Sequence, residues 1–316
     1  MRPRTLSDDT AFPRVGNDLD NAWINFDQCE LPASALLGKH AEVTPEGEYR
    51  LKTAGVLPFE MVGQRLYTGR VAVAQAALAF RSELFRRTRA YSDAKPTYAR
   101  GVDELPVLSD VPQLRALFEE NAAAAAATEA FVGQCEARLS ECLVGGTTPP
   151  PDLVDAIATA KVVAVEQSID ACHRLKQEVG SFALMADAGF LHLDMLQCCK
   201  FAEVRREKPF PWPPLLPVAR SMTLHGFCLA CAVPRQGDSR ILMQKLARDR
   251  LKRFAKEPAA AQGADTPEAA MCRELASKMA AHPGSQADAW TASWREVYAL
   301  AEAVMTRVQN DFQVAK

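Results

Sequence analysis

Residues 59–91 read FEMVGQRLYTGRVAVAQAALAFRSELFRRTRAY, and this stretch decides the fold class. Its apolar side chains recur every three or four residues, which is the spacing of one face of an α-helix. Valine and alanine fill all but one position from 71 to 77, so the middle of the stretch is small and smooth. Because the distance between packed helices depends on the side chains at their contact, the stretch predicts a long helix that lies close to other helices.

The same spacing recurs on the C-terminal side of this stretch. A connector rich in turn residues leads to a second helix that runs to about Val144, with Asp110 as its expected cap and Pro112 in its first turn. A third helix is expected to begin near Asp152, after the helix-breaking run GGTTPPP.

Further helices are expected in the C-terminal part of the chain. One follows Gly237 and has Asp238 or Ser239 as its cap, and another begins at Thr266 before a proline. A last helix starts at Ser285, which has an acidic residue three positions later, and continues to the end of the apolar pattern. Together the helices predict a mainly α protein with an up-and-down helical bundle.

The region before the first long helix lacks the helical spacing of apolar residues. Residues 22–38, AWINFDQCELPASALLG, contain a short alternating apolar run and then Leu31-Pro32, which predicts one strand and a turn. Residues 41–59, AEVTPEGEYRLKTAGVLPF, are expected to form a loop.

Composition excludes several classes of function. The 316 residues carry a net charge of −2, which does not favour nucleic acid or an anionic membrane as the main partner. No run of eighteen apolar residues occurs, so no membrane span is expected. The first twenty residues lack the apolar core of a secretory signal, and the last residues, QVAK, are not the Ser-Lys-Leu address of peroxisomal proteins.

The nine cysteines are expected to be free thiols in a reducing compartment. Cys228 and Cys231 form a CxxC pair, but the other nearby cysteines, Cys198 and Cys199, are adjacent and do not easily bind one ion together. No metal site is therefore expected. The phosphate-binding motifs GxGxxG and GxxxxGK[ST] and the nucleophile motif GxSxG are also absent from the sequence.

The helical pattern breaks at residues 199–220, CKFAEVRREKPFPWPPLLPVAR. Directly after Glu203 the chain carries two arginines and a run of prolines. Taken alone, Glu203 is an ordinary surface glutamate at the start of a surface loop, and such a loop is long for a compact domain.

Several stretches resemble the acyl-CoA oxidase and acyl-CoA dehydrogenase family, with closer similarity to the oxidases. Residues 19–49 resemble the part of the oxidases that leaves the β-domain, and LYTGRVAVAQAALAFRSELFRRTRAY at 66–91 resembles the long helix that follows. DELPVLSDVPQLRALF at 103–118 is similar to the start of the next helix. CHRLKQEVGSF at 172–182 and CKFAE at 199–203 are similar to the segments that flank the flavin.

The resemblance implies that Glu203 is the catalytic base. In the family this glutamate is followed at once by glycine and a helix, whereas here Val204 follows it. Joining Glu203 to Gly237 restores the family pattern as CKFAE followed by GDSRILMQ, so residues 204–236 read as an insertion. All codons of Val204 begin with GT and Gln236 can be encoded by CAG, so a retained intron or a gene-model error is favoured over a genuine surface loop.

The resemblance also divides the chain. Residues 1–58 are the end of a β-domain and a linker, with the N-terminal domains of the family expected to be missing. Residues 59–203 are a helical domain for flavin and acyl-CoA, 204–236 the proline-rich insertion, and 237–316 the helices that complete the bundle. A homodimer is expected, because family members pair their C-terminal helices across a subunit interface.

FAD is the cofactor that the resemblance implies, with Arg70, Gly180, Phe182 and Gly237 as contacts. Two departures from the family concern these contacts. The glycine-rich turn near the flavin has one glycine in EVGSF at 178–182, and the family's Arg-x-Phe-Gly is replaced by KPTY at 95–98.

The implied reaction is α,β-dehydrogenation of a fatty acyl-CoA in β-oxidation. The base removes the α-proton while the β-hydrogen leaves as hydride to the flavin. In an oxidase dioxygen then takes the electrons and gives hydrogen peroxide; in a dehydrogenase an electron-transfer protein takes them. An inactive helical fragment that only oligomerises is the non-enzymatic alternative. A peroxisomal location follows from the resemblance alone, and a cytoplasmic location is the alternative.

Overall fold

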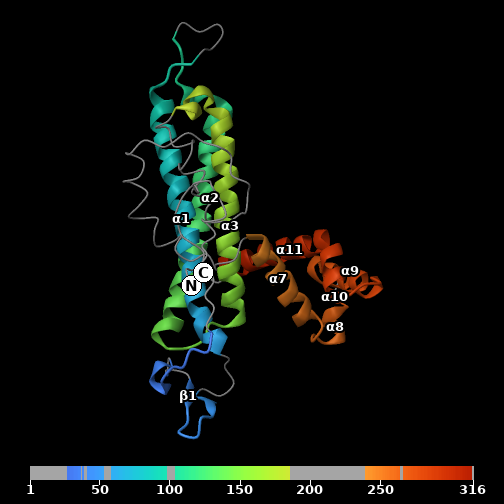
Figure 1. The fold of residues 1–316 in the computed structure, drawn as a ribbon. Helices are drawn as coiled ribbons and strands as arrows, with labels where there is room; N and C mark the ends of the chain where they lie inside the picture. The colour runs from blue at the N-terminus through green and yellow to red at the C-terminus, as the bar shows by residue number, and fades with distance from the viewer. Residues whose placement is uncertain are drawn as a thin grey trace.

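A computed structural model shows a mainly helical protein, as the periodicity predicts (Figure 1). Its only sheet in the described part of the chain has two short strands. The structure describes residues 27–36, 38, 41–52, 58–97, 104–185, 239–263 and 266–314. The predicted strand at Trp23–Phe26 lies outside these residues.

Three long helices form a column, with successive helices running in opposite directions (Figure 1). They are α1 (Pro58–Ala94), α2 (Pro112–Val144) and α3 (Pro151–Glu178). Proline occupies the first turn of α2 and α3, where its missing N–H has no helical partner to lose. Short 3₁₀ turns lie before α2, at Leu108–Asp110 (η2), and after α3, at Gly180–Leu184 (η3), and another lies at Ala33–Ala35 (η1).

The predicted cap of α2 is wrong. Asp110 ends the 3₁₀ turn η2, and the residue at the N-cap is Val111, which makes no side-chain hydrogen bond there. The turn bonds Val111 N–H back to Leu108 O, so the chain enters α2 through its own backbone rather than through a carboxylate. The helix start is set by Pro112, whose fixed φ suits the first helical position.

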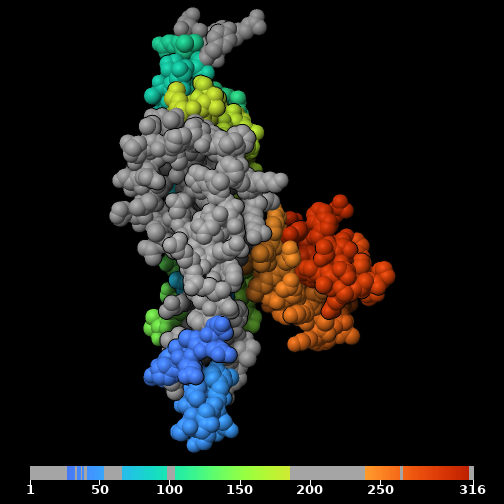
Figure 2. Space-filling model, viewed as in Figure 1, coloured from blue at the N-terminus to red at the C-terminus, as the bar shows by residue number. Residues whose placement is uncertain are grey.

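A second group of helices lies against one side of the column (Figures 1 and 2). It consists of α7 (Ser239–Phe254), α8 (Ala259–Gln262), α9 (Pro267–Ala281), α10 (Gln286–Ala292) and α11 (Trp294–Val314). One hydrophobic core joins this group to the column, and Phe131 of α2 meets Phe312 of α11 edge to face with ring centroids 5.3 Å apart.

Helix α3 is the centre of the fold. It packs against α1 and α2 and also against α7 and α11. Every residue from 155 to 165 is buried, because neighbours cover this part of the helix on all sides. A helix that is buried all round usually carries apolar side chains, so the two charged residues in this range, Asp155 and Lys161, are exceptions that need a physical account.

Two expectations fail for reasons of tertiary packing or turn chemistry. The single helix expected from Ser285 is broken at Ser293 (φ −92°, ψ 26°), where α10, packed against α9, gives way to α11. The expected loop at 41–59 contains an antiparallel hairpin of β1 (Ala41–Val43) and β2 (Tyr49–Leu51), in which Ala41 pairs with Leu51. Its connection turns at Gly47, whose φ of +86° favours glycine.

The two predicted caps in the C-terminal group are confirmed. Thr266 Oγ1 accepts a hydrogen bond from Ala269 N, and Ser285 and Asp288 form a reciprocal capping box. Helix α7 spans Ser239–Phe254, and its predicted cap, Asp238 or Ser239, stays a prediction because Asp238 lies outside the described residues. Among the described residues, no helix has an apolar stretch long enough to cross a membrane.

Ser285→Ala is expected to lower the free energy of unfolding by about 1 kcal/mol. The substitution removes the hydroxyl that accepts from Asp288 N at 3.2 Å, and an N-cap hydroxyl contributes about 0.5–2 kcal/mol. Urea unfolding measures the change, and Ser285→Asp is the control because it keeps a capping oxygen. Equal losses in the two variants would show that the cap contributes nothing.

Candidate functional site

The structure describes three of the five predicted site residues: Arg70, Gly180 and Phe182. Glu203 and Gly237 lie outside the described residues, and so does the insertion between them. The geometry of the site is therefore given by α1, by the end of α3, and by the first turn of α7.

Arg70 lies in α1 and is only 7% exposed. Its guanidinium lies 5.6 Å from the centroid of the Tyr67 ring, which stabilises the cation. Burial lowers the pKa of Arg70, since removal from water penalises the charged form. A buried guanidinium suits a phosphate or carboxylate group, which it can bind with two parallel hydrogen bonds.

Gly180 and Phe182 lie where α3 ends. Gly180 has a φ of +60°, directly after the C-cap residue Val179, which is the usual position of a helix-ending glycine. Phe182 stacks on Tyr91 of α1, with ring centroids 3.9 Å apart and planes 9° apart. Both residues thus have local structural roles, whether or not they also contact a cofactor.

The structure does not bring Arg70 and Phe182 together. Phe182 contacts Tyr91, which is 21 residues after Arg70 on the same helix (91 − 70). At 1.5 Å per residue the two positions are about 30 Å apart along α1. Within one chain, Arg70 and Phe182 therefore cannot contact the same flavin ring.

Sequence reasoning missed a buried polar contact between α3 and α7. Lys161 Nζ donates to Ser239 Oγ at 3.3 Å, and both residues are fully buried. Ser239 is the first residue of α7 and lies two positions after Gly237. The sequence does hold a signal, because Lys161 is the one charged residue in the otherwise uncharged run from Ala156 to Val165.

Arg70 and Lys161 lie at the same level of the column. Helices α1 and α3 run in the same direction (Figure 1). Val73 of α1 and Val165 of α3 belong to one buried cluster. Arg70 precedes Val73 by about one turn, and Lys161 precedes Val165 by about one turn. Two buried cationic residues thus occupy the level at which the chain enters α7.

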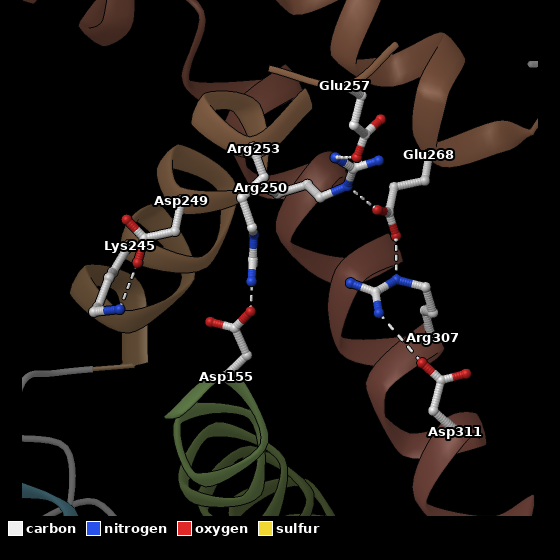
Figure 3. Close-up of polar contacts among 9 residues, drawn as sticks. All are labelled: Asp155, Lys245, Asp249, Arg250, Arg253, Glu257, Glu268, Arg307 and Asp311. Atoms are coloured by element: carbon white, nitrogen blue, oxygen red, sulfur yellow. Dashed lines mark hydrogen bonds and ion pairs between the residues drawn. The ribbon is translucent and has the colours of Figure 1, made fainter. Parts of the chain in front are cut away.

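A network of charged residues holds the other end of α7 (Figure 3). Arg253 donates to Asp155 of α3, and Arg250 donates to Glu257, at 2.8 Å, and to Glu268 of α9. Arg307 of α11 also donates to Glu268, at 2.9 Å. Burial alone would raise the pKa of Glu268, but the hydrogen bonds from Arg250 and Arg307 outweigh it and the pKa is lowered.

At Asp155 the effect of burial on the pKa is larger than the effect of the hydrogen bond, so the pKa is raised. Burial raises the pKa of Asp155, and the bond from Arg253 opposes this effect without reversing it. The bond between Asp155 and Arg253 connects α3 to α7 (Figure 3). We therefore assign this network to the stability of the helical packing.

Metal binding finds no support in the described part of the chain. No group of three histidine, cysteine or acidic side chains there could hold an ion. The CxxC pair lies outside the described residues. The cysteines that the structure describes are all free, as predicted: Cys29, Cys135, Cys142, Cys172 and Cys272.

Thiol labelling at pH 8 is expected to modify Cys29 readily and to spare Cys135 and Cys272. Cys29 is exposed, whereas burial raises the pKa of Cys135 to about 12 and that of Cys272 to about 11. At pH 8 both buried groups are thiols rather than reactive thiolates. Peptide mapping after alkylation measures this, with a urea-unfolded sample as control; rapid folded-state labelling of Cys135 would contradict the packing.

The fold is shared with acyl-CoA oxidases. No family model and no curated protein matches the sequence. The solved acyl-CoA oxidase 1 of Arabidopsis thaliana matches 96% of this chain with a TM-score of 0.63 and 17% identity. An acyl-CoA oxidase from tomato matches 90% with a TM-score of 0.60 and 15% identity.

A third solved structure is acyl-CoA oxidase-2 of Caenorhabditis elegans, bound with FAD, ascaroside-CoA and ATP. It matches 92% of this chain with a TM-score of 0.59 and 14% identity. The chain spans less than half the length of these enzymes: 47%, 44% and 43%, respectively. At these identities the similarity establishes an acyl-CoA oxidase-like fold, which is that of their helical C-terminal part.

Proposed function

We propose that this chain is part of a flavin-dependent acyl-CoA oxidase that converts fatty acyl-CoA to trans-2-enoyl-CoA in β-oxidation. The observation that carries the proposal is the acyl-CoA oxidase-like fold over at least nine tenths of the chain. Dioxygen is the proposed electron acceptor and hydrogen peroxide the second product.

FAD is the proposed cofactor, and the described residues fit it in part. Arg70 is a buried cation that can bind an anionic part of the cofactor. Gly180, Phe182 and Gly237 remain proposed contacts, but Phe182 already stacks on Tyr91 and lies far from Arg70. When bound, FAD accepts the hydride from the β-carbon.

Glu203 is the proposed base. Its carboxylate takes the α-proton of the thioester, which becomes acidic enough only when the carbonyl oxygen is polarised as negative charge develops. In the sequence it follows Cys198, Cys199 and Phe201, and an apolar setting raises a carboxyl pKa toward neutral. The proposed role requires that Glu203 lie close to the start of α7, which holds if Glu203 is joined directly to Gly237.

The division into residues 1–58, 59–203, 204–236 and 237–316 belongs to the same proposal, as do a homodimer and a peroxisomal location. Sequencing of the transcript across codons 190–250 tests the insertion. A message that joins codon 203 to codon 237 supports the intron hypothesis. Translation of the intervening codons in the mature message would overturn it.

The function is tested by flavin content and peroxide formation. The full-length protein, purified with FAD, is expected to be yellow and to release one peroxide per acyl-CoA oxidised. Reduction of bound flavin without peroxide would indicate a dehydrogenase that uses an electron-transfer protein. A colourless, folded oligomer that leaves acyl-CoA unchanged would overturn the enzyme proposal and favour a helical oligomerisation module.

A further inference from the structure

We propose that Lys161 is a positioning residue: through Ser239 it fixes the first turn of α7 on α3, and with it the chain that leads into α7. Lys161 Nζ lies 3.3 Å from Ser239 Oγ, and the two residues are 78 positions apart in the sequence. The functional consequence rests on the proposed oxidase, whereas the structural part of the inference does not.

Burial of Lys161 costs hydration free energy, which indicates a role beyond packing. An ammonium group loses a large hydration energy on burial, and apolar residues of similar volume often stabilise a core at least as well. The residues around Lys161 in α3, from Ala156 to Val165, are otherwise uncharged and fully buried or nearly so. A methionine would fill the same space without a charge.

The first turn of α7 also carries an ion pair with α3. Arg240 lies 3.8 Å from Glu166, and both side chains are more than one third exposed. The exposed part of this ion pair is screened by water and salt, which limits its contribution to stability. Leu242 and Met243 of α7 are also buried in the core that α7 shares with α3, so the bond to Lys161 acts together with apolar packing, and it is the buried polar contact at the first residue of α7.

The position of Ser239 limits where the residues of the proposed site can lie, because they are close to it along the chain. Ser239 is two residues after Gly237, so the two Cα atoms lie no more than about 7 Å apart. If Glu203 is joined to Gly237, it lies three residues before Ser239 and within about 11 Å of it. A shift of about 1 Å in a reacting group can lower a rate about 100-fold, so a fixed start of α7 would matter for the base.

The test measures hydrogen–deuterium exchange and steady-state kinetics on the full chain. Ser239→Ala removes the acceptor with a minimal change in volume, and Lys161→Met removes the donor. Ser239→Thr restores a hydroxyl, and Glu166→Gln is the matched control at the neighbouring exposed contact. Backbone amides of residues 240–245 report on the first turns of α7, and those of α2 report on the rest of the fold.

We expect Ser239→Ala and Lys161→Met to speed exchange at 240–245 about tenfold, with α2 unchanged. Ser239→Thr should restore slow exchange, and Glu166→Gln should change it less than twofold. In a chain with oxidase activity, the first two variants should lower kcat about 10- to 100-fold with little change in KM. Thermal unfolding should show no matching loss of stability for Lys161→Met.

Unchanged exchange in Ser239→Ala would overturn the inference, and so would an equal effect of Glu166→Gln. If kcat falls in the variants only in proportion to the fraction of folded protein, Lys161 contributes to stability and does not position the site. If the wild-type chain has no oxidase activity, the proposed function fails. The exchange experiment still decides whether Lys161 holds α7.

Discussion

Glu203→Gln is expected to lower kcat for acyl-CoA oxidation about 10²–10⁴-fold while flavin content stays the same. Glutamine is similar in size to glutamate but cannot accept the α-proton, and a positioned general base contributes a factor of this order. Rapid mixing of the oxidised protein with acyl-CoA measures the loss directly as slower bleaching of the flavin absorbance.

The matched control is Glu141→Gln, on the exposed surface of α2. It removes one carboxylate from the chain without touching α3 or α7, so kcat should stay within twofold of the wild type. If Glu203→Gln keeps the wild-type kcat, Glu203 is not the base. The proposal that Glu203 is joined directly to Gly237 then loses its support from the reaction mechanism, whether or not the fold is unchanged.

Leu246→Ala is expected to lower the free energy of unfolding by about 2–5 kcal/mol. Leu246 lies in the middle of α7 and is 0% exposed, within the core that joins α7 to α3 and α11. Truncation to alanine removes buried methyl groups and leaves a cavity, and a buried leucine usually costs this much. Urea unfolding monitored by circular dichroism measures the change.

Ile241→Ala provides the comparison within the same helix. Ile241 is 60% exposed, so its truncation removes little buried surface, and alanine favours helix at least as well as isoleucine. We expect a change of no more than about 0.5 kcal/mol. Similar effects of the two substitutions would mean that α7 is not anchored through Leu246.

Local features of the fold were predictable from the sequence. The long helix at 59–91 is observed as Pro58–Ala94, because its apolar spacing extends over many turns. The caps at Thr266 and Ser285 were predictable because each depends on groups within three residues of one another. Asp110 had the right chemistry for a cap but lost the position to a 3₁₀ turn, which the residues around it do not reveal.

The candidate site was predictable only through motif resemblance. Arg70 proved to be buried, as suits a binding residue, but nothing in the sequence placed it about 30 Å from the contact between Phe182 and Tyr91. Lys161 is the one charged residue between Ala156 and Val165, a signal that sequence reasoning missed, and its partner follows 78 residues later. Hydrogen bonds over such separations leave no periodic signal in a single sequence.

The class of fold, the main helices and several of their ends could be predicted from the sequence, because they depend on side-chain spacing and on bonds within one turn. Three features became clear only from the packing of the helices: the burial of residues 155–165 of α3, the separation of α10 and α11 at Ser293, and the contact of Lys161 with Ser239. These features depend on which helix faces which, and that is set by the fit of whole helical surfaces in three dimensions.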